Sequence, residues 1–330
     1  MRMLNLFYEE TPFADRWLPG DRYPRTIARR ILRGRSQPGG QMRVFLNLCA
    51  GLERIKVPYR VNDYKYANGN PDEVVGIIGK PHLLNRVDWR NPIVFGAAVY
   101  SHPLDDPELL ARLAILKVLV PGKWMREMCA PAWGDTVQAW PVGIDTEKWS
   151  PAPSESKDID ILLYDKVRWE HERYEAEFTS VIKQTLVDRG LTTEVIRYGF
   201  YQEDFFLSLL KRSKAMIFLC EHETQGIAYQ QALSCGVPIL AWDRGGYWQD
   251  PSYYPHKVKF APVTSVPYWD ERCGVKFKDI DQFPDRLAEF LDRQAASDFS
   301  PRNFILENLT LEKCAARYVD FYNDAAGSPA

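Results

Sequence analysis

Short hydrophobic runs alternate with amphipathic segments along most of the chain. In the segment 40–54, Val44, Leu48 and Leu52 recur at helical spacing on one face. Apolar runs that are short enough for strands lie at 3–9, 59–61, 74–79, 92–103, 117–122, 160–165, 193–199, 215–220 and 238–242. Because strands that alternate with helices build parallel sheets covered by helices, this pattern predicts an α/β fold.

One interruption divides the pattern into two halves. Residues 146–158 are rich in proline, serine and charge, which is typical of a linker, and 330 residues suit two domains. We therefore expect a Rossmann-like domain at 1–150, with a basic insert at about 10–38, and a second one at 151–305. The segment 306–330 predicts a helix that packs back on the first domain, through Ala316, Tyr318, Val319 and Phe321.

The composition limits the function. The chain is 45% hydrophobic and 26% charged with a net charge of -2, which gives no bulk case for a nucleic-acid partner. Its six cysteines are scattered without a C-x-x-C pair, which favours reduced thiols in the cytoplasm. The first residues lack the apolar stretch of a signal peptide, and no apolar run approaches the roughly 18 residues that span a bilayer. We expect a cytoplasmic protein.

The stretch "CEHETQGIAYQQALSCGVP" at 220–238 predicts a binding edge. A hydrophobic strand ends there in polar residues and a glycine before a helix begins. Gly226 lets the backbone pass close to a ligand, and the free N–H groups of the helix that starts at Ile227 and Ala228 suit a phosphate or sugar oxygen. Glu223 could hold sugar hydroxyls or could merely cap the helix. Gln231, one turn later, faces either the ligand or a packing surface.

Four segments, at 38–61, 118–151, 221–240 and 303–322, occur in an order that resembles the retaining GT-B glycosyltransferases of the group 1, family 4-like class. The resemblance implies two doubly wound domains facing across a cleft, with the C-terminal helix crossing back to the first. It also implies an enzyme that moves a sugar from a UDP- or GDP-sugar to an acceptor, with retention of configuration and without a metal or other cofactor. The resemblance further implies a role in polysaccharide or glycolipid biosynthesis.

The family's donor motif places two glutamates eight positions apart. Glu223 fills the first position, but the second falls on Gln231. A carboxylate accepts hydrogen bonds from both ribose hydroxyls, whereas an amide offers one acceptor oxygen and an NH₂ group that only donates. The nucleotide preference could therefore be altered, or the chain could be a non-catalytic descendant.

The resemblance also implies cations on the donor diphosphate. Lys166, Arg168 and Arg173 are the candidates, and Arg168 with Arg173 best preserves the family's spacing; a solvated start of a charged helix is the alternative. Gly39 and Gly40 correspond to a glycine loop that approaches the phosphate. The same resemblance places His102 near the transferred sugar, with a structural histidine as the alternative. Glu223 and His102 are thus the catalytic candidates.

Other sequence features bear on metals and partners. The "DID" at 158–160 matches a metal-binding pattern of another glycosyltransferase fold, but it precedes its strand, so we expect no metal site. The acceptor is a sugar, a lipid-linked molecule or a small molecule. The arginine-rich segment 16–43 could contact an anionic membrane surface at the inner face, or could be a solvated extension.

Three other functions remain open from the sequence. A sugar-nucleotide epimerase of the same fold would need no acceptor, and a nucleotide-sugar-binding module would not turn the donor over. A dinucleotide-dependent oxidoreductase ranks last, because no G-x-G-x-x-G follows the first strand.

Overall fold

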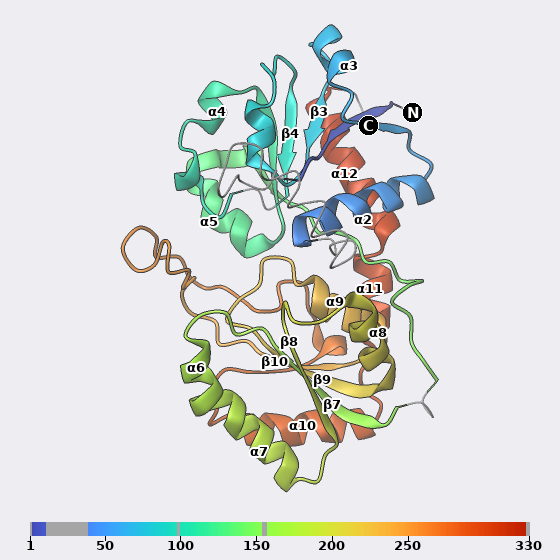
Figure 1. Ribbon diagram of the computed structural model, residues 1–330, viewed down its shortest axis with the longest axis vertical. Helices are drawn as coiled ribbons and strands as arrows, with labels where there is room; N and C mark the ends of the chain where they lie inside the picture. The colour runs from blue at the N-terminus through green and yellow to red at the C-terminus, as the bar shows by residue number, and fades with distance from the viewer. Residues whose placement is uncertain (1, 11–38, 98–99, 154–156, 328–330) are drawn as a thin grey trace, which may run out of the picture. The chain divides into compact units, whose positions relative to one another are not determined.

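The computed structural model describes residues 2–10, 39–97, 100–153 and 157–327, and the chain forms two compact units (Figure 1). The first unit comprises Met1–Val120, Ala132–Gln138 and Ala315–Ala330, and the second comprises Pro121–Pro131 and Ala139–Cys314. This division follows which residues pack together. The domain bounds inferred from the linker at 146–158 stay a prediction.

The first unit is built on a six-stranded sheet with the order β2-β1-β3-β4-β5-β6, in which β2 to β5 run parallel. Its strands are β1 (Leu4–Phe7), β2 (Tyr59–Val61), β3 (Val75–Ile77), β4 (Ile93–Gly96), β5 (Ile115–Val120) and β6 (Val137–Ala139). Its helices are α2 (Gly40–Arg54), α3 (Tyr64–Gly69) and α4 (Leu109–Arg112), whereas α5 (Lys123–Trp133) belongs to the second unit up to Pro131. The predicted face of α2 is confirmed, since Val44, Leu48 and Leu52 are buried.

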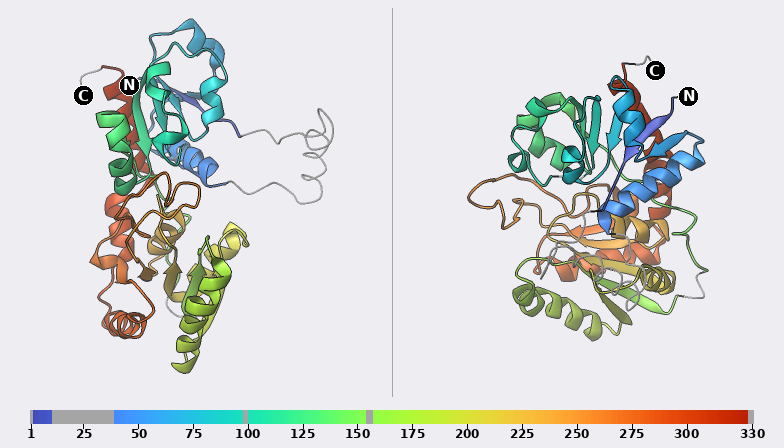
Figure 2. Two further views of the ribbon diagram at one scale, coloured as in Figure 1. Left: turned by 90° about the vertical axis from the view of Figure 1, so that its left-hand side faces the viewer. Right: turned by 45° about the horizontal axis from the view of Figure 1, so that its top comes forward.

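The last helix, α12 (Leu311–Ala325), lies beside β1 in both views of Figure 2. The Tyr322 hydroxyl accepts a hydrogen bond from the Asn5 backbone N–H at 3.0 Å and donates one to the Val74 carbonyl. Tyr318 packs where Gly76 of β3 has no side chain. The Tyr322 hydroxyl of this helix therefore serves as hydrogen-bond partner for a backbone N–H in β1 and a backbone carbonyl directly before β3.

The predicted packing face of α12 is only partly right. Tyr318 is buried as predicted, but Ala316 is exposed, and Val319 and Phe321 are half-buried. Ala315 and Tyr322 are buried instead, in phase with Tyr318. The prediction was rotated by about one residue because Ala316 and Ala315 are equivalent in hydropathy, and only the contact with the sheet distinguishes them.

The second unit contains a five-stranded parallel sheet with the order β11-β10-β9-β7-β8. Its strands are β7 (Ile159–Asp165), β8 (Thr193–Arg197), β9 (Ser213–Leu219), β10 (Ile239–Trp242) and β11 (Gly274–Phe277). Its helices are α6 (His171–Tyr174), α7 (Ser180–Asp188), α8 (Glu203–Arg212), α9 (Ile227–Ser234), α10 (Phe283–Ala295) and α11 (Pro301–Asn308), with a π-helical turn at Glu175–Thr179.

Helices cover both faces of this second sheet (Figure 1). One apolar cluster joins the strands to α7 and α10, and another joins the opposite face to α8, α9 and α11. A parallel sheet between two helix layers is a doubly wound, Rossmann-like arrangement, so the predicted α/β class with two parallel sheets is confirmed. The sequence pattern had not identified β11, α10 or α11.

None of the helices in the described parts of the chain combines the length and apolar character needed to cross a bilayer. The cytoplasmic location and the contact with a membrane surface stay predictions. Most of the arginine-rich segment 16–43 lies outside the described residues.

Candidate functional site

The strand order of the second unit points to one place for a ligand. The chain runs from β7 to β8 on one side and then returns to β9 on the other side of β7. Loops that follow β7 and β9 therefore diverge, and crevices in doubly wound sheets form at the carboxyl ends of such strands. Here those loops contain residues 166–169 and 220–226, which include the predicted residues Lys166, Arg168, Glu223 and Gly226.

A buried ion pair joins the two loops. Lys166, directly after β7, binds the carboxylate of Glu223, which follows β9, and the two side chains are only 11% and 10% exposed. Burial lowers the pKa of Lys166, but the Glu223 carboxylate outweighs burial, so this pKa lies above its usual value. The ammonium also lies 4.4 Å from the centre of the Tyr198 ring. Lys166 is therefore charged and fixed at the strand edge.

The backbone of Glu223 is held from two sides. Its N–H donates to the Thr264 carbonyl at 3.0 Å, and its carbonyl accepts from Nε1 of Trp124 at 2.8 Å. These bonds fix the turn between β9 and α9, so the carboxylate has a defined position rather than that of a free helix cap.

Helix α9 starts at a glycine that no other residue can replace without strain. Gly226 has φ 80°, and a Cβ atom there would overlap the ring of Tyr229. No side chain caps the helix, so the N–H groups of its first turn, which starts at Ile227 and Ala228, lack intrahelical partners. Gln231, on the next turn, is 8% exposed. The fold thus brings Glu223, the helix start and Gln231 together.

Glu221 and His222 were interpreted as ordinary strand-end residues, and the structure gives them a larger part. Both are 2% exposed. The Glu221 carboxylate accepts from the backbone N–H groups of Arg168 at 2.8 Å and Trp169 at 2.9 Å, which ties the loop after β7 to the loop after β9. Sequence spacing could not reveal this contact, because it joins residues far apart in the chain.

His222 is enclosed by aromatic rings and cations. Its ring centre lies 5.0 Å from that of Trp169 and 5.8 Å from that of Trp124. Burial, followed by the charges of Arg168, Arg244 and Lys166, lowers the pKa of His222 to about 3. The imidazole is therefore neutral near pH 7.

Of the predicted cations, Arg173 lies apart from this cluster. It is on α6, its side chain is 59% exposed, and its guanidinium pairs with Glu177 at 3.0 Å and Glu170 at 3.2 Å on the same helical stretch. The spacing that favoured Arg168 with Arg173 therefore does not bring the two guanidinium groups to one ligand position. Helical phase directs Arg173 to the neighbouring acids.

The loop after β10 supplies another cation. Arg244 follows β10 and precedes Gly245 and Gly246, whose φ angles are 65° and 78°. Its Nη1 lies 3.3 Å from the Tyr174 hydroxyl, while its buried Nη2 has no hydrogen-bond partner among the described residues. The sequence had shown this glycine loop without assigning a role to it.

Three other side chains in the second unit could ligate a metal. Ligand atoms of Asp165, His171 and Glu175 lie within 4.8 Å of one another. Asp165 already binds His171 Nε2 at 2.7 Å, and Glu175 pairs with Lys183 at 2.6 Å, so a bound cation would have to displace an ammonium group. Sequence spacing missed this group because it bridges a strand end and two helical turns. The absence of a metal requirement stays a prediction.

The first unit has an equivalent edge, between β1 and β3. Glu10, after β1, lies 3.2 Å from Lys80, after β3, and also accepts a hydrogen bond from the Tyr8 hydroxyl. Among the described residues, no atom lies within 4 Å of a Cβ built at Gly39 or Gly40, at the start of α2. The approach of this loop to a phosphate stays a prediction, and an acid–base pair that the sequence analysis did not identify marks the strand edge.

His102 follows β4 and caps a short 3₁₀ helix at Pro103–Asp105. Its Nδ1 accepts from the Leu104 N–H at 3.1 Å, and burial lowers its pKa. Because Nδ1 accepts, the proton of the neutral ring is on Nε2. The structural role foreseen for this histidine is present, and its contact with a sugar stays a prediction.

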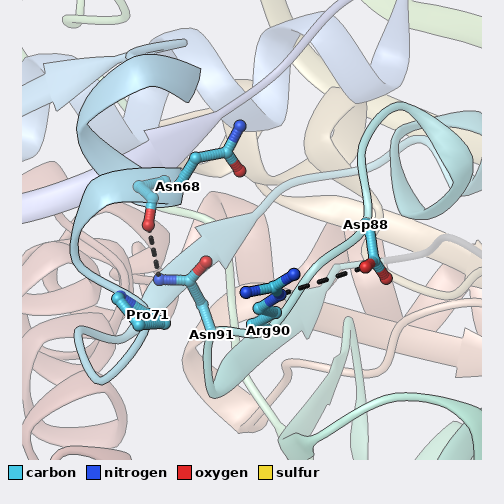
Figure 3. Close-up of a pocket in the computed structure, with 6 residues that line it drawn as sticks. Asn68, Pro71, Asp88, Arg90 and Asn91 are labelled. Atoms are coloured by element: carbon cyan, nitrogen blue, oxygen red, sulfur yellow. Dashed lines mark hydrogen bonds and ion pairs between the residues drawn. The ribbon is translucent and has the colours of Figure 1, made fainter.

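A hollow of about 260 Å³ in the first unit is not at this edge (Figure 3). It is lined by Ala67, Asn68, Pro71, Asp88, Arg90 and Asn91. These residues precede β3 and β4, at the amino ends of the strands, and Asn91 donates to the carbonyls of Asn70 and Glu73 at 2.9 Å. The side chain of Asn91 therefore has a structural function here.

Comparison with known proteins yields structural similarity only. No protein-family description and no curated protein sequence matches the chain. Among solved structures, AviGT4, titled as a glycosyltransferase involved in avilamycin A biosynthesis, matches with a TM-score of 0.57 and 14% identity, over 98% of this chain and 99% of that one.

Two further solved glycosyltransferase structures are similar to the chain. Sucrose-phosphate synthase from Thermosynechococcus elongatus matches with a TM-score of 0.50 and 14% identity, over 88% of this chain and 82% of the other. The lipopolysaccharide outer core galactosyltransferase WaaB matches with a TM-score of 0.50 and 11% identity, over 98% and 99%. At such identities the likeness concerns the fold alone, and the chain has the fold of the GT-B glycosyltransferases.

Proposed function

We propose that the protein is a glycosyltransferase that transfers a sugar from a nucleoside diphosphate sugar, with the second unit as the donor-binding part. The observation that carries this proposal is the Lys166–Glu223 pair, which bridges β7 and β9 directly before the uncapped start of α9. A fixed cation, a fixed carboxylate and free helix N–H groups are what a phosphorylated sugar requires. The GT-B fold agrees with this function.

In this proposal, different residues bind the sugar and the phosphates of the donor. Glu223 accepts hydrogen bonds from sugar hydroxyls, while Lys166, Arg168 and the N–H groups of Ile227 and Ala228 bind phosphate oxygens. In the reaction, the bond from the anomeric carbon to the phosphate oxygen breaks and a bond to an acceptor hydroxyl oxygen forms. The acceptor proton passes to the departing phosphate, whose negative charge the cations stabilise. With no protein nucleophile in the scheme, the acceptor attacks from the side that the phosphate leaves, and configuration is retained.

Gln231 sets the nucleotide preference in this scheme. Its amide can accept from one ribose hydroxyl and donate to the other oxygen. We infer weaker ribose binding than a carboxylate would give. The donor is a UDP- or GDP-sugar, and no metal takes part.

The first unit supplies the acceptor surface. Gly39 and Gly40 give the backbone room at the start of α2, and His102 offers Nε2–H to a sugar hydroxyl. AviGT4 is involved in avilamycin A biosynthesis and WaaB is a galactosyltransferase of the lipopolysaccharide outer core, so a glycan, a lipid-linked molecule or a small molecule all suit this role.

A panel of nucleotide-sugars tests the function. We expect one donor to raise the melting temperature and to be hydrolysed slowly, with both effects lost in Glu223→Ala. Glu194→Ala is the control, because Glu194 is exposed on β8 of the same sheet. Stabilisation without any release of nucleotide would identify a non-catalytic binding module, the alternative that Gln231 favours. Failure of every donor in both assays would refute the proposal.

A further inference from the structure

A buried hydrogen-bond donor at the β7/β9 edge has no acceptor. Arg168 Nη2 lies 3.4 Å from Nδ1 of His222, and a guanidinium only donates, so Nδ1 is the accepting nitrogen. The proton of the neutral ring is therefore on Nε2. That atom is buried, and none of the described residues accepts a hydrogen bond from it. Leaving such a donor unpaired is costly, which suggests that it serves a ligand.

Neighbouring groups restrain the ring. Trp169 and Trp124 both contact it, and the Arg168 guanidinium lies 4.5 Å from the Trp169 ring centre while also donating to the His222 carbonyl at 3.2 Å. Packing and the contact of Nδ1 with Arg168 therefore favour one direction for Nε2–H. A preorganised donor of this kind gains a bond on binding without losing conformational entropy.

The charges around His222 are mainly positive. Arg168, Arg244 and Lys166 all act on it, but the charge of Lys166 is balanced by Glu223, and Arg168 Nε lies 3.8 Å from Glu221 Oε2. Arg244 pairs with no acid among the described residues and retains its own buried donor without a partner, at Nη2. The surplus charge and the two unpaired donors call for an anionic acceptor.

We propose that His222, with Arg168 and Arg244, forms an oxyanion subsite in which Nε2–H donates to an oxygen of a phosphate or carboxylate on the ligand. Arg244 neutralises the ligand charge, and Arg168 holds the imidazole in the required tautomer. A neutral hydroxyl could accept the hydrogen bond but would leave Arg244 uncompensated. The subsite stands on its own geometry, and only the identification of its ligand as the donor diphosphate rests on the proposed function.

Calorimetric titration with three probes tests the subsite: inorganic pyrophosphate, UDP and glucuronate. His222→Leu removes the donor, His222→Gln keeps an N–H at similar reach, and His256→Gln is the control, because His256 is exposed. We expect His222→Leu and Arg244→Gln each to weaken binding about tenfold or more, while His222→Gln retains most of the affinity. If these variants lose affinity for pyrophosphate and UDP, the subsite binds phosphate. If they lose affinity for glucuronate alone, it binds a carboxylate.

The ligand-free protein separates binding from a structural role. His222→Leu removes an unsatisfied buried donor and the Nδ1 acceptor of Arg168, whose Nη2 keeps the backbone carbonyl of residue 222 as an acceptor, so the melting temperature should change little. A lower melting temperature with unchanged affinities would overturn the proposal, as would failure of all three probes to bind the wild type. Pyrophosphate binding that depends on His222, without turnover of any nucleotide-sugar, would keep the subsite and refute the enzyme. Turnover of a nucleotide-sugar with an unchanged KM in His222→Leu would support the enzyme and refute the subsite.

Discussion

At the scale of single residues, the buried Lys166–Glu223 ion pair predicts how substitutions at this strand edge change the stability of the fold. Both side chains are nearly buried, so removing one leaves an uncompensated charge. We expect Glu223→Gln to lower the free energy of unfolding by about 3 kcal/mol or more, whereas Lys166→Met/Glu223→Leu stays near the wild type. Urea unfolding measures both. Glu177→Gln, which breaks only the exposed pair with Arg173, should cost about 1 kcal/mol or less. Equal losses of unfolding free energy in Glu223→Gln and Glu177→Gln would show that burial of the ion pair does not increase the cost of breaking it.

The lowered pKa of His222 predicts that the protein loses stability as the pH falls. The unfolded imidazole has a pKa of about 6.5, and in the folded protein burial lowers it to about 3. Between these values the unfolded state binds the extra proton, so stability falls as the pH is lowered, by about 1.4 kcal/mol per unit. The charged groups around the ring are Arg168, Arg244, Lys166 and Glu221.

The measurement compares wild type with His222→Gln in denaturant unfolding from pH 8 to pH 4. Only the wild type contains the titrating ring, so the difference in stability between the two proteins should shrink or reverse toward acid. Parallel curves over this range would mean that the folded imidazole titrates normally. The other carboxylates and histidines cancel in the comparison.

At the scale of elements, the start of α9 depends on one glycine. Gly226→Ala meets both a left-handed backbone and the Tyr229 ring, while Gly190→Ala, with φ 69° and open space around it, meets only the backbone. We expect a loss of about 1–2 kcal/mol for Gly190→Ala and a clearly larger loss for Gly226→Ala, from the added overlap. Only Gly226→Ala should also weaken the binding of UDP, measured by calorimetry. Similar stability losses would show that Tyr229 moves aside without cost.

Helix α12 gives a second test. Tyr322→Phe removes a hydroxyl that accepts from the Asn5 backbone N–H and donates to the Val74 carbonyl, so the Asn5 N–H loses this acceptor while the Val74 carbonyl keeps the Asn5 side-chain amide as a donor at 3.2 Å. The expected cost is about 1–3 kcal/mol. Hydrogen exchange should quicken at β1 and β3 and stay unchanged at β7 and β9, which belong to the other unit. Tyr247→Phe, at an exposed tyrosine, is the control.

Sequence periodicity identified most elements because strands, helices and glycine stops are local signals. It predicted nine of the strands and the turn from β9 to α9 around Glu223 and Gly226, whose role in binding stays a prediction. It missed β6 and β11, and it missed the partners of Glu221, which come from a loop more than 50 residues away. It favoured Arg173 by spacing, although helical phase turns that side chain outward. Contacts between distant segments depend on strand order, which a hydrophobic pattern does not encode.

At the scale of the whole molecule, charge is unevenly distributed. The net charge is -2, yet the segment 16–43 contains eight arginines, at 16, 22, 25, 29, 30, 33, 35 and 43, and one acid, Asp21. Basic residues near an anionic membrane contribute about 1 kcal/mol each, so this segment could hold the protein at a lipid surface that its average charge would not favour. Trp17, Ile27, Ile31 and Leu32 add apolar contacts.

We expect the protein to float with vesicles that contain anionic lipid and not with neutral ones, and we expect added salt to release it, because screening weakens such contacts. A variant with glutamine in place of Arg29, Arg30, Arg33 and Arg35 should remain in solution while keeping its melting temperature and its affinity for UDP. Replacement of the exposed Arg90, Arg189, Arg286 and Arg317 is the matched control, since it removes the same charge elsewhere. Failure to bind anionic vesicles even at low salt would leave the segment as a solvated extension, and equal loss in the control would assign the effect to overall charge rather than to this segment.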